Sequence, residues 1–158
     1  MTEDTTWLTP DAHQRLIEEL QYLETEGRAD AADRLAEARS HGDIRENADY
    51  EAAKDEQGLL EARIRKIRRL LDQAEISTPE ATERVEIGCV VTLSDEDGSE
   101  MELFVAPTEN KVPGYVLASP TSPIGRAVLG AEVGEVVSYE APSGTFRVTV
   151  RGVRPFNG

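Results

Sequence analysis

Two hydrophobic periodicities divide the chain, a helical one in the first half and a strand-like one in the second. After Thr9 and Pro10, a cap residue and a proline typical of a helix start, apolar or small residues recur every three or four positions. The expected seam consists of Leu16, Leu20, Leu23, Gly27, Ala31, Leu35 and Ala38. The pattern shifts at Gly27, which predicts a slip in the seam and a local bend before the helix ends near Ser40.

A second helix is predicted to start near Glu46, with an unbroken heptad-type pattern. Its seam consists of Ala53, Gln57, Leu60, Ile64, Ile67, Leu71 and Ala74. Two long helices joined by a loop of about five residues pack antiparallel as a helical hairpin. With about 30 residues in each helix, the predicted arm is about 45 Å long and has only a narrow apolar seam.

Beyond this hairpin the period changes from helical to alternating, as expected for strands. We therefore predict a hairpin domain over residues 1–76, a polar linker over 77–87 and a small β-rich domain over 88–158. The predicted elements of the last domain are strands at Cys89–Leu93, Met101–Ala106, Tyr115–Ala118, Val136–Glu140 and Phe146–Val153, and a short helix from Ser122 to Leu129. The fold class is α+β, an antiparallel coiled-coil hairpin followed by a compact sheet domain.

Charge and composition narrow the class of partner. The formal net charge is -14, which argues against free duplex DNA as the main partner because such binding neutralises phosphates with Lys and Arg. The single cysteine, Cys89, excludes an intramolecular disulfide, and no Cys/His cluster indicates zinc. The start of the chain lacks the pattern of a signal peptide, and no apolar run approaches membrane-spanning length. We expect a cytoplasmic protein without a membrane partner.

The predicted hairpin loop carries two carboxylates, Asp43 and Glu46, three residues apart. Carboxylate oxygens are hard ligands suited to Mg²⁺, which takes few protein ligands and keeps several waters. Such a loop could complete a metal site in a partner but could hardly build one alone. The same residues also suit the start of the second helix, where Asp43 would act as a cap. From the residues alone, the capping interpretation is favoured.

Two long motifs favour the metal-binding interpretation over the capping interpretation. Gly42-Asp43-Ile44-Arg45-Glu46-Asn47-Ala48-Asp49-Tyr50 resembles the tip motif of the Gre family of bacterial transcript-cleavage factors. Ser122-Pro123-Ile124-Gly125-Arg126-Ala127-Val128-Leu129-Gly130 resembles a second motif of that family. The motifs occur in the family's order and the resemblance covers nearly the whole chain. The departures, such as Ile44 for Leu, leave Asp43 and Glu46 unchanged.

The resemblance implies a function on bacterial RNA polymerase. The hairpin would enter the secondary channel of the polymerase and stimulate cleavage of backtracked RNA, without the chain being a free-standing enzyme. Asp43 and Glu46 would be the catalytic and metal-ligating residues, sharing Mg²⁺ with the polymerase, whereas the isolated, monomeric protein would bind none. The contact residues implied near the tip for the polymerase and the nascent RNA 3′ end are Arg39, Lys54, Asn47 and Tyr50. The implied polymerase anchor is Ser122, Pro123, Gly125 and Arg126, in a domain expected to be FKBP-like.

Other interpretations stay open. Arg39 could form surface ion pairs, and Tyr50 could pack beneath the tip rather than stack on a base. The basic residues between Arg63 and Arg69 are expected to pair with Glu18, Glu19 and Glu24. Besides a GreA-like cleavage factor, the chain could be a Gre-like polymerase inhibitor, or a prolyl isomerase or chaperone. We rank the last lowest, because the aromatic residues of the second half are few and scattered in the sequence.

Overall fold

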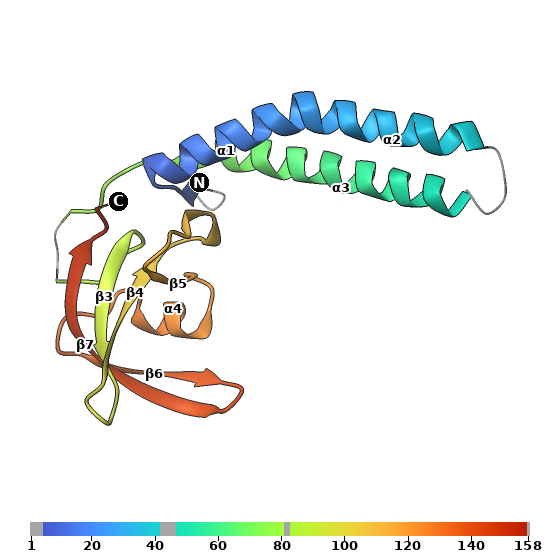
Figure 1. Cartoon of the computed structure of the whole chain (residues 1–158). Coiled ribbons are helices and arrows are strands. Elements are labelled where there is room, and N and C mark those ends of the chain that lie inside the picture. The colour runs from blue at the N-terminus through green and yellow to red at the C-terminus, as the bar shows by residue number, and fades with distance from the viewer. Residues whose placement is uncertain (1–4, 42–46, 81–82, 158) are drawn as a thin grey trace. The chain divides into compact units, whose positions relative to one another are not determined.

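A long helical hairpin forms one part of the molecule (Figure 1). The computed structural model describes residues 5–41, 47–80 and 83–157 of the chain. The first arm consists of α1 (Pro10–Tyr22), the π-helical turn η1 (Leu23–Gly27) and α2 (Arg28–His41), and the second arm is α3 (Asn47–Asp72). The predicted hairpin is confirmed.

The helix start has the predicted cap. The Ala12 backbone N–H donates to Thr9 Oγ1 at 3.0 Å, and Pro10 opens α1. This bond satisfies one of the amide groups that have no partner within the first turn of a helix.

The predicted seam is the least exposed line of both arms. Every seam position of the first arm is buried or half-buried, whereas most of its other positions are exposed. In α3, Ile64 and Ile67 are 1% and 0% exposed, and Ala38 and Ala53 are buried closer to the loop. Leu59, one position outside the seam, is 73% exposed. The hairpin therefore buries a single narrow stripe.

The shift in the seam at Gly27 has a structural cause. Residues Leu23–Gly27 form a π-helical turn, which holds one more residue than an α-helical turn. The extra residue returns the seam to the face that meets α3. Close to this turn, a Cβ atom on Gly27 would lie 3.3 Å from Leu60 Cδ1, so the glycine permits a tight approach of the two arms.

Ion pairs connect the two arms of the hairpin. Arg28 donates to both carboxylate oxygens of Glu61, and Arg63 donates to both oxygens of Glu19. Arg34 pairs with Glu56 and Arg68 pairs with Glu24. The expected pairing of the basic residues with Glu19 and Glu24 is confirmed for Arg63 and Arg68. These pairs are partly or largely exposed, so each contributes little to the stability of the hairpin.

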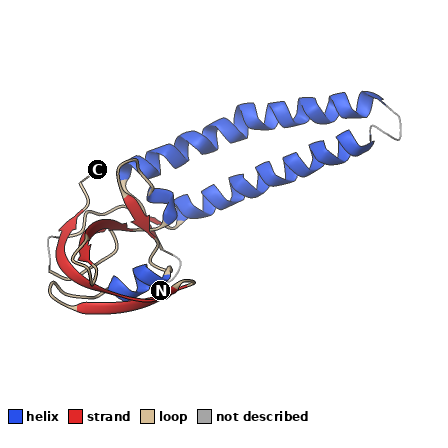
Figure 2. Ribbon diagram, turned by 60° about the horizontal axis from the view of Figure 1, so that its bottom comes forward, coloured by secondary structure: helices blue, strands red, loops and turns tan. Residues whose placement is uncertain are grey.

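The second part is a curled mixed sheet with the strand order β5-β4-β3-β7-β6 (Figures 1 and 2). Only β5 runs parallel to its neighbour, and the other pairs are antiparallel. The elements are β3 (Cys89–Ser94), β4 (Glu100–Val105), the 3-10 turn η3 (Thr108–Asn110), β5 (Val116–Ala118), α4 (Pro123–Val128), β6 (Val136–Ala141) and β7 (Gly144–Pro155). Each predicted strand and the short helix of this domain is present, and the predicted fold class is confirmed.

Both faces of this sheet are covered. Alternate residues of β3 point to opposite sides, and five of its six positions are buried, four of them hydrophobic residues or cysteine. Val91 and Leu93 belong to a core that includes Val128 of α4, which lies inside the curve of the sheet in Figure 2. Val90 belongs to a second core on the other face, with Trp7, Phe104, Ala106 and Phe156.

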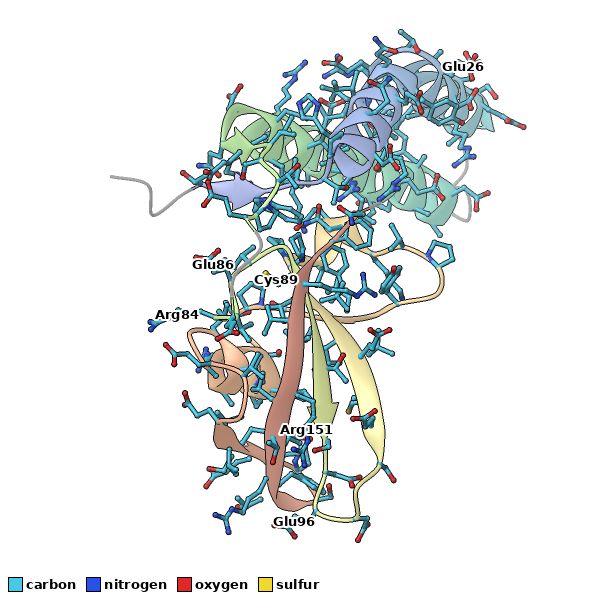
Figure 3. All side chains as sticks on the ribbon, turned by 90° about the vertical axis from the view of Figure 1, so that its left-hand side faces the viewer. Glu26, Arg84, Glu86, Cys89, Glu96 and Arg151 are labelled. Carbon is cyan, nitrogen blue, oxygen red and sulfur yellow. The ribbon has the colours of Figure 1, made fainter. Side chains whose placement is uncertain are left out.

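Strand β3 is irregularly paired with β7 near its end. Figure 3 shows Cys89 at one end of this strand and Glu96 in the turn beyond the other end. The pairing of β3 with β7 shifts register between Thr92 and Leu93, opposite Arg151. The Arg151 side chain donates from Nε to Ser94 Oγ at 2.8 Å, which gives the buried serine hydroxyl a partner. The irregularity thus lies where a long strand bends with the curl of the sheet.

The compact units differ from the predicted sequence ranges. Described residues up to Ala12 group with those from Ala74 onward, and His13–Gln73 form the second unit. The reason is a short parallel pairing of β1 (Thr6–Trp7) with β2 (Ala74–Glu75), which the periodicity did not predict. Part of the predicted linker 77–87 is also folded, since Val85 is 1% exposed and exchanges backbone hydrogen bonds with Gly130 and Ala131.

The aromatic residues of the second half are not scattered in space. Phe104 stacks on Phe156 with ring centroids 4.2 Å apart, and Trp7 and Tyr115 meet Phe104 edge to face. Their separation in the sequence hid this cluster, because strand pairing and the return of the N-terminal segment bring them together. The rings form a core together with Val90 and Ala106.

Candidate functional site

The two predicted metal-ligating carboxylates belong to the connection between the hairpin arms. Helix α2 ends at His41 and α3 begins at Asn47, so Asp43 and Glu46 fall between them in the sequence. Both lie outside the described residues, as does the side chain of Asn47. Their predicted roles in catalysis and metal binding stay predictions.

Three other predicted residues meet beside this connection. Two cations lie close to the ring of Tyr50, with Arg39 Cζ 5.7 Å and Lys54 Nζ 5.8 Å from its centroid. Lys54 reaches the ring because residues four apart share one face of a helix, and Arg39 comes from the end of the other arm. Cations at this distance are attracted to the ring face. The arrangement holds two exposed positive charges near the loop.

These neighbours change the pKa of the Tyr50 hydroxyl. Its pKa is lowered, chiefly by the hydrogen bond with the Arg39 guanidinium, although partial burial opposes the change. The ring is half-buried, whereas Arg39 and Lys54 are exposed. Tyr50 therefore packs against its neighbours in the isolated protein, and the two cations are available to an anionic partner.

A shallow groove lies between the arms next to this cluster. Its volume is about 290 Å³, and the small side chains Ala38, Ala52 and Ala53 leave it unfilled. Its rim is formed by Arg34, Glu37, Asp49 and Glu56. Among the described residues, no three His, Cys, Asp or Glu side chains come together in a way that could hold a metal ion. The described end of the hairpin thus presents a slender, charged surface.

The second motif forms the beginning of α4. Ser122 caps this helix, since its Oγ accepts from the Gly125 N–H at 3.1 Å and donates to the Ser119 carbonyl at 2.6 Å. Pro123 occupies the first turn, where its missing N–H has no cost. These contacts give the Ser-Pro pair a structural role in addition to the predicted anchoring role.

Gly125 and Arg126 differ in what they offer. A Cβ atom on Gly125 would lie 1.9 Å from the Ser119 carbonyl oxygen, so only glycine fits there. Arg126 is exposed on the last turn of the same helix. Of the predicted anchoring residues, Arg126 and Pro123 have side chains on the surface, whereas Gly125 is buried.

Sequence reasoning missed two residues at the start of the hairpin, Trp7 and Asn110. Trp7 is the only tryptophan of the chain and is 8% exposed, and Asn110 is fully buried. Trp7 lies two positions before the helix cap Thr9, and its large apolar ring was the available signal. No local signal distinguishes Asn110, because two of the three partners of its side chain lie about 100 positions earlier in the sequence.

The chain thus belongs to a class of two-part proteins that combine a helical hairpin, here with a charged end, and a curled mixed sheet. Comparison with known families identifies the family within that class. Residues 6–76 match the family described as transcription elongation factor, N-terminal, and residues 79–155 match transcription elongation factor, GreA/GreB, C-term. The chain is 40% identical over 162 residues to transcription elongation factor GreA of Streptomyces coelicolor, covering 99% of this chain and 98% of the relative. It is 41% identical to GreA of Chloroflexus aggregans, covering 98% of this chain and 100% of the relative.

The chain therefore belongs to the GreA/GreB family of transcription elongation factors. Solved structures similar to it include GreA factor homolog 1 (Gfh1) of Thermus thermophilus, with 29% identity and a TM-score of 0.44 over 95% of this chain and 99% of that one. Another is a GreA/GreB elongation factor from Nitrosomonas europaea, with 20% identity and a TM-score of 0.41 over 94% and 97%. The family assignment comes from the sequence comparisons and confirms the predicted resemblance. Within the described ranges, no helix is both long and apolar enough to cross a membrane.

Proposed function

We propose that this protein binds RNA polymerase, inserts its hairpin into the secondary channel and stimulates cleavage of backtracked RNA. The observation that carries the proposal is the position of Asp43 and Glu46 in the sequence, between the two arms of a hairpin that belongs to an elongation-factor family. A slender arm with one buried seam can enter a channel, because it needs no partner domain to cover its sides.

The loop carboxylates suit a shared metal site. Two carboxylates are hard oxygen donors of the kind that Mg²⁺ prefers, but they are too few to hold the ion without further ligands. In this proposal the polymerase supplies the remaining ligands, and Asp43 contributes more to metal retention than Glu46, which positions water. When bound, a second Mg²⁺ would stabilise the charge that develops on the attacking and leaving oxygens.

The chemical step is hydrolysis within the polymerase. A water oxygen attacks the phosphorus of a phosphodiester, the bond to the RNA 3′ oxygen breaks, and that oxygen receives a proton. The 3′ segment leaves and a new 3′ end remains in register. The factor acts in the cytoplasm as a single copy and is not a free-standing enzyme, since its carboxylates complete a site of another protein.

The cations beside the loop are proposed to contact the extruded RNA or the polymerase near it. Arg39 and Lys54 are exposed and lie close to the Tyr50 ring, and Arg39 precedes in the sequence the segment that carries the carboxylates, whereas Lys54 follows it. Asn47, at the start of α3, is proposed to share this role. Exchanging Arg39 and Lys54 for alanine should weaken photocrosslinking of the factor to a labelled RNA 3′ end. Unchanged crosslinking would assign these cations to the fold of the tip alone.

The sheet domain is proposed to anchor the factor on the polymerase through the start of α4. Arg126 and Pro123 are exposed there, while Ser122 and Gly125 shape the turn that presents them. Arg126→Ala should raise the dissociation constant for polymerase without unfolding α4. An unchanged dissociation constant would remove Arg126 from the anchor.

The direct test uses backtracked elongation complexes with Mg²⁺, incubated with and without the full chain. We expect faster shortening of the RNA from its 3′ end and renewed extension when nucleotides are added. If the protein binds the polymerase but leaves the cleavage rate unchanged, the cleavage proposal is wrong and the chain acts as a channel-binding inhibitor instead.

A further inference from the structure

Two basic residues of the hairpin, Arg39 and Lys54, contact an aromatic ring. Their charges lie 5.7 and 5.8 Å from the centroid of the Tyr50 ring. Among the described residues, neither of them forms an ion pair. In contrast, four other basic residues of the hairpin each pair with a glutamate of the opposite arm, namely Arg28, Arg34, Arg63 and Arg68.

The three residues of this contact come from both arms. Arg39 lies in the last turn of α2, and Tyr50 and Lys54 lie in the first two turns of α3, the helix beside α2 in Figure 1. Tyr50 and Lys54 are four positions apart and therefore share one face of α3. The Tyr50 ring thus connects a cation of its own helix with a cation of the other arm.

Tyr50 contacts the two cations by different groups. The Arg39 guanidinium donates a hydrogen bond to the Tyr50 hydroxyl, and this bond lowers the pKa of that hydroxyl. The guanidinium also lies near the ring, whose face attracts cations. Lys54 is attracted by the same ring. Loss of the hydroxyl should therefore affect Arg39 first, whereas loss of the ring should affect both residues.

The ring offsets two costs of keeping these charges together. Because both distances start at one centroid, the two charges lie within about 12 Å of each other, where like charges repel. Long basic side chains also lose rotamer freedom when they are held in one place. The attraction of each cation to the ring opposes both effects. Removal of the ring should therefore let the two side chains separate.

The exposed charges of this contact suit an anionic ligand. Arg39 and Lys54 are exposed, whereas the Tyr50 ring is half-buried, in a chain with a formal net charge of -14. Basic side chains form strong, charge-assisted hydrogen bonds with phosphate oxygens. Side chains that are already held in place lose less freedom when the ligand binds. The phosphodiesters of an RNA strand are ligands of this chemistry.

We propose that Tyr50 is a positioning residue for RNA during transcript cleavage. It holds Arg39 and Lys54 together as one cationic site at the loop end of the hairpin, and phosphates of the RNA bind to these two cations. This inference rests on the proposed function. Tyr50 acts through the two cations and does not itself stack on a base, so its effect depends on their presence.

The first measurement is photocrosslinking in backtracked elongation complexes. The RNA carries a label and a photoreactive nucleotide at its 3′ end, and the full-length factor is added at a concentration that saturates the polymerase. Tyr50→Leu should lower crosslinking to the factor about threefold to tenfold, because the ring and the hydroxyl are both lost. Tyr50→Phe keeps the ring and should cause a smaller loss.

The decisive comparison repeats Tyr50→Leu in a protein that already carries Arg39→Ala and Lys54→Ala. If Tyr50 acts through these cations, its substitution lowers crosslinking no further in that background. Longer irradiation keeps the weaker crosslinking of this background measurable. A loss as large as in the wild-type background would overturn the inference, because Tyr50 would then contact the RNA itself or support only the fold of the hairpin.

Tyr22→Leu is the matched control, since Tyr22 is 52% exposed in α1 of the same hairpin. It should leave crosslinking unchanged. Helical circular dichroism verifies that each variant is folded. Should Tyr50→Leu fail to fold, Tyr50→Phe takes its place, and its smaller loss should disappear in the Arg39→Ala background. Persistence of that loss would contradict the inference.

A measurement on the isolated full-length protein separates this inference from the proposed function. Nuclear Overhauser effects are expected between the Tyr50 ring protons and the side-chain protons of both Arg39 and Lys54. Their absence would show that Tyr50 does not hold the two cations. If these effects are present but the wild-type factor neither crosslinks to RNA nor stimulates cleavage, the proposed function is wrong, and the positioning of RNA by Tyr50 is refuted with it.

Discussion

The hairpin and the sheet domain differ in how they bury their hydrophobic side chains. The hairpin buries one stripe, with Ile64 and Ile67 fully enclosed and most other positions exposed. The sheet domain covers both faces of its central strand, with one core around Val91 and another around Phe104. The difference teaches that one chain can combine a thin part, which carries the loop between the arms, with a compact part that holds two hydrophobic cores.

Charge is also used differently in the two parts. Among the described residues, four ion pairs connect the arms of the hairpin, from Arg63–Glu19 near the base to Arg34–Glu56 nearer the loop. Exposed pairs of this kind contribute little free energy. The arms are therefore held together mainly by the seam.

The largest loss of stability is expected in the aromatic core of the sheet domain. Phe104 is fully buried against Phe156, Trp7 and Tyr115. Phe104→Ala should reduce the free energy of unfolding by about 3–5 kcal/mol. Urea denaturation followed by the fluorescence of Trp7 measures this directly. A loss below about 1 kcal/mol would mean that the second core does not support the domain.

A smaller loss is expected in the seam of the hairpin. Ile64→Ala should cost about 2–4 kcal/mol, because a buried side chain is removed from a narrow interface that can relax only in part. Leu59→Ala is the matched control on the same helix, and it should change stability by less than about 0.5 kcal/mol since Leu59 is 73% exposed. Thermal unfolding followed by helical circular dichroism compares the two variants. Equal effects would contradict the seam.

The smallest effect is expected for a charge pair. Hydrogen bonds from Arg63 lower the pKa of Glu19, although partial burial opposes the shift. Both side chains are more than a third exposed, so the pair should contribute less than about 1 kcal/mol. A lowered carboxyl pKa stabilises the fold above the ordinary glutamate pKa, and this contribution is lost as the pH falls through the lowered value. A double-mutant cycle with Glu19→Gln and Arg63→Gln, repeated at falling pH, checks both statements; a coupling that grows on acidification would refute them.

The elements of both parts were predictable because each has a clear period. The seams from Leu16 to Ala38 and from Ala53 to Ala74, and the strands from Cys89 onward, follow directly from spacing. The shift of the seam at Gly27 predicted an irregularity in the helix, and in the structure this irregularity is the π-helical turn of Leu23–Gly27. A period reveals which face is buried but not how the helix adapts to keep it buried.

Contacts between distant parts of the sequence were not predictable in this way. Asn110 lies 101 positions from Thr9, and Trp7 meets Phe104 only after the N-terminal segment returns to the sheet. The region predicted as a linker contains Val85, whose burial depends on a bridge to residues beyond 129. Single polar residues and short pairings of two residues leave no periodic trace.

The candidate site was predicted in part from chemistry and in part from resemblance. The chemistry of the residues favoured a capping role for Asp43, and the family motif favoured metal binding. The structure brings Arg39, Tyr50 and Lys54 together beside the loop, a juxtaposition that the sequence only suggested. The structure also explains locally why Ser122 and Gly125 occur in the second motif. The turn at the start of α4 uses the hydroxyl of Ser122 as a cap, and it has no room for a side chain at Gly125.

The most direct test of the central claim removes the loop carboxylate of Asp43. Cleavage by backtracked complexes is measured in limiting Mg²⁺ with the wild-type factor, with Asp43→Ala and with Asp55→Ala, which removes an exposed carboxylate from α3. We predict that Asp43→Ala lowers cleavage to the level seen without factor while polymerase binding stays nearly intact, and that Asp55→Ala behaves as the wild type. Cleavage by the Asp43 variant at the wild-type rate would contradict metal binding by the loop and leave Asp43 as a helix cap.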